Sequence, residues 1–329
     1  MQLNNLLRGA TFFQHSGVSI VYVFMPILAQ SLTRNIFEVG ITIASFFLAQ
    51  ILSSLYFGRI SDSRGVRLTF IRIGFISCAV MFGLHYFADS SLILLLVRLG
   101  AGVASGMMVP AMLAYTYESG KDKSKVASVI SFHALGWMAG ILAAGITNNE
   151  KTIFLISTGL FLAGLFFSYR LPKFTISREV TPGTTKNVIL QNKYLFLSLL
   201  LRHIGAASVW TILPLILTEI FGAKLYEVSI VYVANTATAF VLMNLMAGKI
   251  SIQNITKFKI GVGLTVFVFA GMAVMSSWWM AIPCMALVGV TWAFLYIGGS
   301  IHLMENNPDR KSTRLNSSHS SVSRMPSSA

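Results

Sequence analysis

Several ionisable side chains lie inside long apolar stretches of this sequence, where a charged group is costly and usually has a functional role. Three of them are His15, His133 and His203, and histidine is the side chain that titrates near neutral pH without help from its surroundings. All 11 aspartates and glutamates fall in or near the hydrophilic connections between these stretches. Proton transfer in the apolar part of the chain would therefore depend on imidazoles, unless a coupling carboxylate belongs to a segment that this sequence lacks. The alternative for each histidine is a hydrogen-bonded interior residue without a chemical role.

Two arginines share this apolar setting. Arg98 lies about seven residues into its stretch, which places it about 10 Å from the nearer end of a helix. Arg202 directly precedes His203. A guanidinium at such a depth usually faces a cavity or a partner. The alternative for Arg98 is a side chain that extends to the nearer layer of lipid headgroups.

The composition predicts a membrane protein with many spans. Only 11% of the 329 residues are charged and 55% are hydrophobic, whereas a soluble domain has roughly a quarter charged residues. The net charge of +14 comes from short connections rather than from one face of a domain, which argues against nucleic acid as a partner. Cys78 and Cys284 lie far apart in apolar stretches, so we expect no disulfide, no metal site and no cofactor.

Apolar stretches of about 20 residues are long enough to cross a bilayer as helices. The sequence contains ten of them, so we expect an all-α membrane protein. The connections alternate between basic and non-basic, and by the positive-inside bias the basic set, which begins at Arg8, is cytoplasmic. We therefore expect an integral protein of the cell membrane with a cytoplasmic N-terminus. The approximate spans are 9–31, 38–57, 68–87, 91–115, 127–147, 152–170, 194–219, 227–248, 259–277 and 279–303.

The first and second parts of the chain resemble each other. The matching pairs are His15 with His203, Glu38 with Glu227, and Gly58 with Gly248, at offsets of 188 to 190 residues. A near-constant offset predicts two structural repeats, an arrangement known from membrane transporters.

The repeat defines the domains that we expect. These are a six-helix half at 1–170, a cytoplasmic linker at 171–193 and a second half at 194–311 with four helices. Residues 312–329 are rich in serine and lack apolar periodicity, so we expect them to be disordered. Because the repeat stops in mid-unit, we predict that two helices are missing and that this tail is not native. The alternative is a ten-span protein with a natural disordered C-terminus.

The densest group of charges is Gly58-Arg59-Ile60-Ser61-Asp62-Ser63-Arg64-Gly65-Val66-Arg67, between the second and third apolar stretches. We expect a turn at the membrane surface, in which Asp62 can accept hydrogen bonds at a helix N-terminus and the glycines allow close approach and tight turning. Such a turn could act as a conformational latch. The alternative is a set of ordinary cytoplasmic charges that only orient the chain. The latch candidates are Gly58, Asp62, Arg64, Gly65, Arg67 and the nearby Glu118.

With these residues the chain resembles the major facilitator superfamily, whose members have twelve helices in two halves. The family signature between the second and third helices runs Gly-x-x-x-Asp-(Arg/Lys)-x-Gly-(Arg/Lys)-(Arg/Lys). Ser63 and Val66 stand at usually basic positions, and Arg64 is expected to supply the displaced charge. The matching residues are Gly58, Asp62, Gly65 and Arg67.

Two further motifs of the family have counterparts here. Arg98, Gly102 and Gly106 follow the pattern Arg-x-x-x-Gly-x-x-x-Gly of the fourth helix. The fifth helix is similar to that of the family's antiporters in its glycines, although Ile141 replaces the expected proline and weakens this part of the resemblance. Glycines four residues apart also form helix-packing surfaces without any other role. The fifth-helix glycines are Gly136, Gly140 and Gly145.

The resemblance covers residues 1 to about 311 and implies a secondary transporter, not an enzyme, that moves a small solute by alternating access. It further implies a monomer in the lipid bilayer, with proton-coupled export as the finer expectation. In the family, the aspartate at the position of Asp62 pairs with the second half near the start of the eleventh helix, a segment that we expect to be missing here, so Glu118 is the expected partner for Arg67 or Arg64. One alternative is a non-transporting sensor or scaffold on the same fold. A membrane enzyme is another, although no nucleophile or metal-ligand motif supports it. In the family, the spans that line the central cavity would carry Tyr22, Trp137, Trp210, Asn235, Trp292 and Tyr296, although most aromatic residues in spans serve packing.

Overall fold

The computed structural model describes residues 2–119, 123–147, 149–173, 189–248 and 252–306. Most of the predicted linker and the whole predicted tail lie outside these ranges, as do residues 249–251, which belong to the repeat of the charged segment. The domain boundaries and the non-native tail therefore stay predictions.

The described chain folds into long helices. The first half contains α1 (Leu3–Tyr22), α2 (Met25–Thr33), α3 (Ile36–Arg64), α4 (Arg67–Leu84), η1 (His85–Phe87), α5 (Ser91–Ser119), α6 (Lys123–Thr147) and α7 (Glu150–Tyr169). The second half contains α9 (Lys193–Leu215), the π-helix η2 (Ile216–Ile220), α10 (Leu225–Gly248), α11 (Asn254–Ala273), η3 (Trp278–Met280) and α12 (Ala281–Asn306).

The helical membrane fold expected from the sequence is confirmed. Ten helical segments of the described residues are long and apolar enough to cross a membrane, and each coincides with one predicted span. The outward faces of these helices carry large apolar side chains, such as Leu48, Leu52 and Leu55 of α3, which are more than half exposed. Such a surface suits lipid rather than water.

Proline distorts the first span of each half. Pro26 lies in the first turn of α2, and the chain leaves the α-helix between Tyr22 and Met25. Its repeat partner Pro214 lies inside α9, two residues before the π-helix Ile216–Ile220 begins. Proline lacks an N–H group and clashes with the preceding turn, so both breaks follow from the sequence.

The expectation of a turn at 58–67 is wrong for most of its length. Helix α3 continues to Arg64, and only Gly65 and Val66 connect it to α4. The apolar stretch ended at Phe57, but the helix extends two further turns beyond the membrane-length run because nothing in Gly58–Arg64 breaks it. Gly65 then ends α3 with a left-handed φ of +67° and donates its N–H to the Ser61 carbonyl at 3.0 Å, which is the usual role of glycine at a helix C-terminus.

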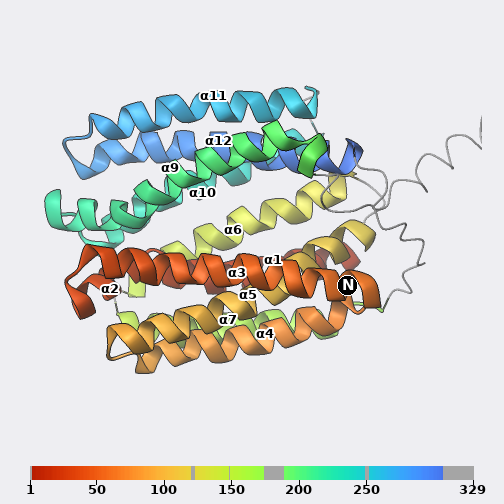
Figure 1. Ribbon diagram of the computed structural model, residues 1–329, viewed down its shortest axis with the longest axis horizontal. Coiled ribbons are helices and arrows are strands. Elements are labelled where there is room, and N and C mark those ends of the chain that lie inside the picture. Colours follow the sequence, from red (N-terminus) through yellow and green to blue (C-terminus); the bar gives the residue numbers. More distant parts are fainter. Residues whose placement is uncertain (1, 120–122, 148, 174–188, 249–251, 307–329) are drawn as a thin grey trace, which may run out of the picture.

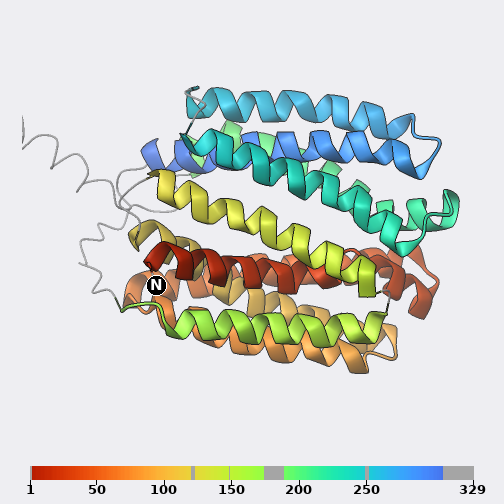
Figure 2. The ribbon, with the colours of Figure 1, turned by 180° about the vertical axis from the view of Figure 1, so that it is seen from behind.

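The two halves use the same packing scheme, as the repeat predicts. In the first half α5 packs against α3 and α4, and in the second half α12 packs against α10 and α11 in the same way. Figures 1 and 2 show the second-half helices as one group and the first-half helices as another, with α6 running between them. The N-terminus lies at the end of the bundle where α3 and α5 finish and α4 starts, and we call this end the N-terminal face.

The halves meet through α6 and α10. At the end of the bundle away from the N-terminal face they also meet through α2 and α9. Along α6, the Ser131 hydroxyl donates to the Asn244 side-chain oxygen of α10 at 3.2 Å. At the end away from the N-terminal face, Leu213 and Leu217 belong to the same apolar cluster as Leu28 and Ala29 of α2. The structure therefore joins the halves along α6 and α10 and, at the end opposite the N-terminal face, also through α2 and α9.

Candidate functional site

An imidazole pair lies between the first and fifth spans. The rings of His15 on α1 and His133 on α6 stack with centroids 3.7 Å apart and planes 14° apart. The Trp137 indole N–H donates to Nδ1 of His15 at 3.3 Å. Because an indole nitrogen can only donate, Nδ1 of His15 is an unprotonated acceptor in this arrangement. His15 is therefore a neutral imidazole that carries its proton on Nε2.

The two histidines approach because α1 and α6 pack closely. A Cβ atom on Gly136 would lie 3.1 Å from the His15 Cβ and 3.2 Å from the Ser16 nitrogen. The Ser16 hydroxyl donates to the Gly136 carbonyl at 3.0 Å across the same contact. At Gly140 an added Cβ would collide with Ser19. Two small residues one turn apart therefore hold the imidazoles together.

Aromatic rings continue from this pair into the second half. His133 meets Tyr296 of α12 edge-on at 5.9 Å, and Tyr296 stacks on Trp292 at 5.3 Å. Trp292 meets the His203 ring of α9 at 5.8 Å. We call this series, which consists of Trp137, His15, His133, Tyr296, Trp292 and His203, the ring path. It joins the two halves roughly 15–20 Å from the N-terminal face, near the middle of the bundle.

Arg202 and the carboxylates define the charge around the ring path. The Arg202 guanidinium carbon lies 5.8 Å from the Trp292 ring centroid. Within the described residues, aspartates and glutamates lie at helix ends or in connections, such as Glu118 at the end of α5 and Glu227 at the start of α10. The ring path is thus lined by neutral rings and a cation, without a carboxylate from the described part of the chain.

Arg98 is buried rather than extended to the membrane surface. Only 2% of this residue is exposed, and its guanidinium carbon lies 4.3 Å above the Phe46 ring of α3. Its Nε and Nη2 atoms are buried without a hydrogen-bond partner. The alternative of a side chain that reaches the lipid headgroups is therefore wrong for this structure.

Arg98 lies near the ring path but outside it. Phe46 contacts Phe47, which contacts Tyr22, and Tyr22 meets Trp137 at 5.1 Å. The sequence did not single out Phe46 or Phe47, because phenylalanine within an apolar stretch carries no signal of its own.

Two of the predicted cavity residues lie elsewhere. Trp210 packs against the apolar cluster that contains Leu28 and Leu213, and its backbone carbonyl accepts a hydrogen bond from the Tyr232 hydroxyl at 3.3 Å. Asn235 is half-buried on α10, and its backbone carbonyl oxygen faces Gly289 of α12. The structure does not bring either residue to the ring path.

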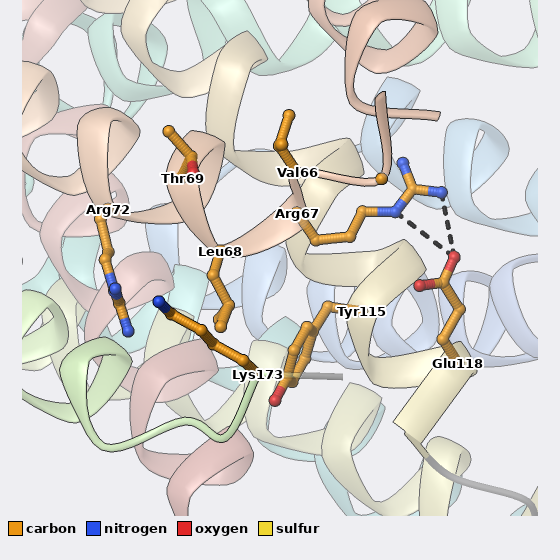
Figure 3. A pocket seen from close by; sticks show the side chains of 9 residues that line it. Val66, Arg67, Leu68, Thr69, Arg72, Tyr115, Glu118 and Lys173 are labelled. Carbon is orange, nitrogen blue, oxygen red and sulfur yellow. Dashed lines mark hydrogen bonds and ion pairs between the residues drawn. The ribbon is translucent and has the colours of Figure 1, made fainter. Parts of the chain in front are cut away.

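The charged segment forms a compact cluster within the first half. Arg67, at the start of α4, pairs with Asp62 and donates to the Ser61 hydroxyl at 3.0 Å. It also donates through Nη2 and Nε to one oxygen of Glu118, at 3.0 and 3.3 Å. Figure 3 shows the two bonds to Glu118. We call Ser61, Asp62, Arg67 and Glu118 the latch cluster.

Members of the latch cluster differ in burial. The Arg67 side chain is 6% exposed and that of Glu118 11%, whereas that of Asp62 is 45% exposed. Arg64 is exposed and takes no part in these bonds. Arg67, rather than Arg64, is thus the basic residue that meets both carboxylates. Ser61 was missed because a serine in a charged segment has no distinguishing spacing.

The other motif glycines differ in what lies against them. Gly102 and Gly106 place α5 against α3, where an added Cβ would lie 2.9 Å from the Ala49 Cβ and 2.8 Å from the Ser53 Cβ. Gly145 places α6 against Ser229 of α10, in the other half. At Gly58 an added Cβ would meet only Pro110, at 3.7 Å, which is an ordinary contact. The expectation that Gly58 allows close backbone approach is therefore wrong for this arrangement.

The sequence profile of the Major Facilitator Superfamily matches residues 9–328. The chain belongs to this family. The match runs into residues 312–328, so the prediction that the tail is not native stays a prediction. As a member of the Major Facilitator Superfamily, the chain is an integral membrane protein of a transporter family and not an enzyme.

Relatives of this superfamily member differ from it widely in sequence. The multidrug resistance protein MdtG of Proteus mirabilis (strain HI4320) is 23% identical over 306 residues, which cover 82% of this chain and 72% of the relative. The crystal structure of a mutant of the nucleoside transporter NupG is similar in fold, with a TM-score of 0.73 at 14% identity over 94% of this chain and 85% of NupG. A bacterial homologue of the human lysosomal transporter Spinster gives a TM-score of 0.61 at 14% identity, over 94% of this chain and 76% of its own. These structures confirm the fold.

Proposed function

We propose that this protein exports a small aromatic solute by alternating access and that the His15–His133 pair carries the coupling proton. The observation that carries the proposal is the ring path, which joins both halves of the fold near the middle of the membrane. A midplane site between two repeats is where secondary transporters bind their substrates. The path lies within one chain, so a monomer suffices.

The hydrogen bonds of the imidazole pair support its role as the proton carrier. His15 accepts from Trp137 through Nδ1, so a proton added to that atom breaks this bond. Two protonated rings 3.7 Å apart would repel each other, so the pair takes up a single proton. His133 contacts Tyr296 of the second half, so a change in the pair acts directly on the junction between the halves.

The charges around the ring path favour a neutral or anionic aromatic solute. Ring faces of Trp292 and Tyr296 offer stacking surfaces, and Arg202 supplies a positive charge beside them. A cationic solute would need a carboxylate partner that the described part of the path does not supply. The relative named a multidrug resistance protein is consistent with export of drug-like compounds.

The latch cluster is proposed to gate the N-terminal face, which by the charge bias is cytoplasmic. In the described arrangement its ion pairs close within the first half. The halves also meet at the end opposite the N-terminal face, through α2 and α9. We propose that Asp62, the more exposed carboxylate, takes a partner from the second half when the N-terminal face closes.

Transport can be tested with the full chain reconstituted into liposomes under an imposed pH gradient. We expect gradient-driven movement of carboxyfluorescein, an aromatic anion, and little movement of ethidium, an aromatic cation. His15→Gln and His133→Gln should abolish the dependence on the gradient. His302→Gln is the matched control, because His302 lies near the C-terminal end of α12 and outside the ring path. This variant should behave as the unmodified protein.

Three outcomes would contradict parts of this proposal. Equal movement with and without a pH gradient would remove proton coupling, and preference for ethidium would overturn the solute class. Binding of carboxyfluorescein without any flux would instead support a non-transporting sensor on the same fold.

A further inference from the structure

A cavity of about 320 Å³ opens beside the latch cluster, at the N-terminal face of the bundle. It is formed where the start of α4, the end of α5 and the chain just after α7 come together (Figure 3). None of the ring-path residues lines it, whereas Arg67 and Glu118 of the latch cluster do. Its lining residues are Gly65, Val66, Arg67, Leu68, Thr69, Arg72, Tyr115, Glu118 and Lys173.

The charge of this cavity is predominantly positive. Among the described residues, Arg67, Arg72 and Lys173 line it together with one carboxylate, that of Glu118. Glu118 already accepts two hydrogen bonds from Arg67. Arg72 and Lys173, on the same side of the pocket in Figure 3, are therefore the cations that an incoming ligand would meet.

Arg72 lines this cavity and has an unused hydrogen-bond donor. Its Nε atom is buried without a hydrogen-bond partner, and its Nη2 atom makes only a long bond of 3.4 Å to the Ser168 carbonyl. Its guanidinium carbon lies 4.7 Å above the Tyr169 ring, which holds the group in place. A buried guanidinium edge without a partner is costly unless an anion completes it.

The first turn of α4 adds donors to the same cavity. Val66 precedes the helix, and its side chain cannot cap the N–H groups at the start of α4. Leu68 and Thr69 of this turn line the cavity. A helix N-terminus favours negative charge, and here it faces the same space as two basic side chains.

We propose that this cavity binds the phosphate group of an anionic ligand. Arg72 and Lys173 supply the charge, the first turn of α4 supplies N–H donors, and Leu68 and Tyr115 form an apolar wall for the carbon part of the ligand. The cavity lies at the ends of membrane-spanning helices, the level of the lipid headgroups. The headgroup of an anionic phospholipid and free phosphate are the two sources of this chemistry. A ligand there would lie against Arg67 and so would couple to the latch cluster.

The test compares lipids and variants of the full chain purified in detergent, with binding measured by native mass spectrometry. We expect phosphatidylglycerol to bind more tightly than phosphatidylcholine, which has the same phosphate but no net charge. Arg72→Gln and Lys173→Gln should each weaken binding about fivefold, and the double variant about 30-fold, the usual effect of a basic side chain near an anionic surface. Arg170→Gln is the matched control, because Arg170 is exposed and lies over Phe166 outside the cavity. Its affinity should not change.

A second arm titrates inorganic phosphate and follows the melting temperature. Stabilisation by phosphate that the double variant loses and Arg170→Gln keeps would support the site with a soluble source. Equal affinity for both lipids together with no effect of phosphate would overturn the proposal. Equal loss in Arg170→Gln and in the cavity variants would overturn it as well, since any basic surface would then suffice.

Discussion

The imidazoles of His15 and His133 stack 3.7 Å apart, although 117 other residues separate them in the chain. The two rings can approach this closely because α1 and α6 pack through Gly136 and Gly140. His15 accepts from Trp137 on one side, and His133 faces Tyr296 of the other half on the other. A change in protonation of this pair therefore reaches both the first half and the junction between the halves.

The hydrogen bond from Trp137 leads to the first prediction. Trp137→Phe removes the N–H donor to His15 but keeps an aromatic ring in its place. The donor stabilises the unprotonated Nδ1, so its loss should let His15 bind a proton more readily. We expect the pH of half-maximal transport to rise by about half to one unit, which corresponds to the net value of one hydrogen bond. An unchanged pH profile in reconstituted liposomes, with normal folding, would show that His15 does not carry the proton.

The sequence predicted the ten spans because membrane crossing depends on length and hydropathy alone. It placed the end of α3 too early, since the helix continues as far as Gly65 permits and not only as far as the apolar run. Contacts such as His133 with Tyr296 could not be predicted, because they depend on how two helices from different halves rotate and tilt. The glycine spacing at Gly136 and Gly140 indicated a packing surface, but not that α1 would occupy it.

The two carboxylates of the latch cluster should differ in their effect on stability. Glu118 is nearly buried and accepts two bonds from Arg67, so Glu118→Gln should lower the free energy of unfolding by about 1–3 kcal/mol. Asp62 is nearly half exposed, so Asp62→Asn should cost less than about 1 kcal/mol. Asp62→Asn should nevertheless slow transport while leaving solute binding largely intact, if Asp62 exchanges partners during alternation. Thermal unfolding gives the first comparison, and flux with equilibrium binding gives the second. A normal transport rate in Asp62→Asn would remove its gating role.

Close packing of α5 against α3 makes Gly102 intolerant of a side chain. A Cβ at this position would lie 2.9 Å from the Ala49 Cβ and still closer to the Phe46 carbonyl, so Gly102→Ala should destabilise the protein by about 1–3 kcal/mol. Gly159 of α7 is the control, because an added Cβ there meets nothing within 4 Å. Gly159→Ala should be neutral or stabilising by up to about 1 kcal/mol, since alanine favours a helix more than glycine. The melting temperature of Gly102→Ala should therefore fall, and that of Gly159→Ala should stay equal or rise. Equal changes in the two variants would contradict the close packing of α5 against α3.

Arg98 allows stability and function to be separated. Its guanidinium is buried with two nitrogen atoms unbonded, so Arg98→Met removes a poorly compensated charge while keeping an extended side chain over Phe46. We expect the free energy of unfolding to stay equal or to rise. Transport of carboxyfluorescein should fall at least tenfold if Arg98 stabilises an anion on its path, since one charge-assisted interaction contributes about 1.5–3 kcal/mol. Arg98→Lys should restore part of the transport because it returns the positive charge. A loss of stability in Arg98→Met with transport unchanged per folded molecule would show that Arg98 serves packing instead.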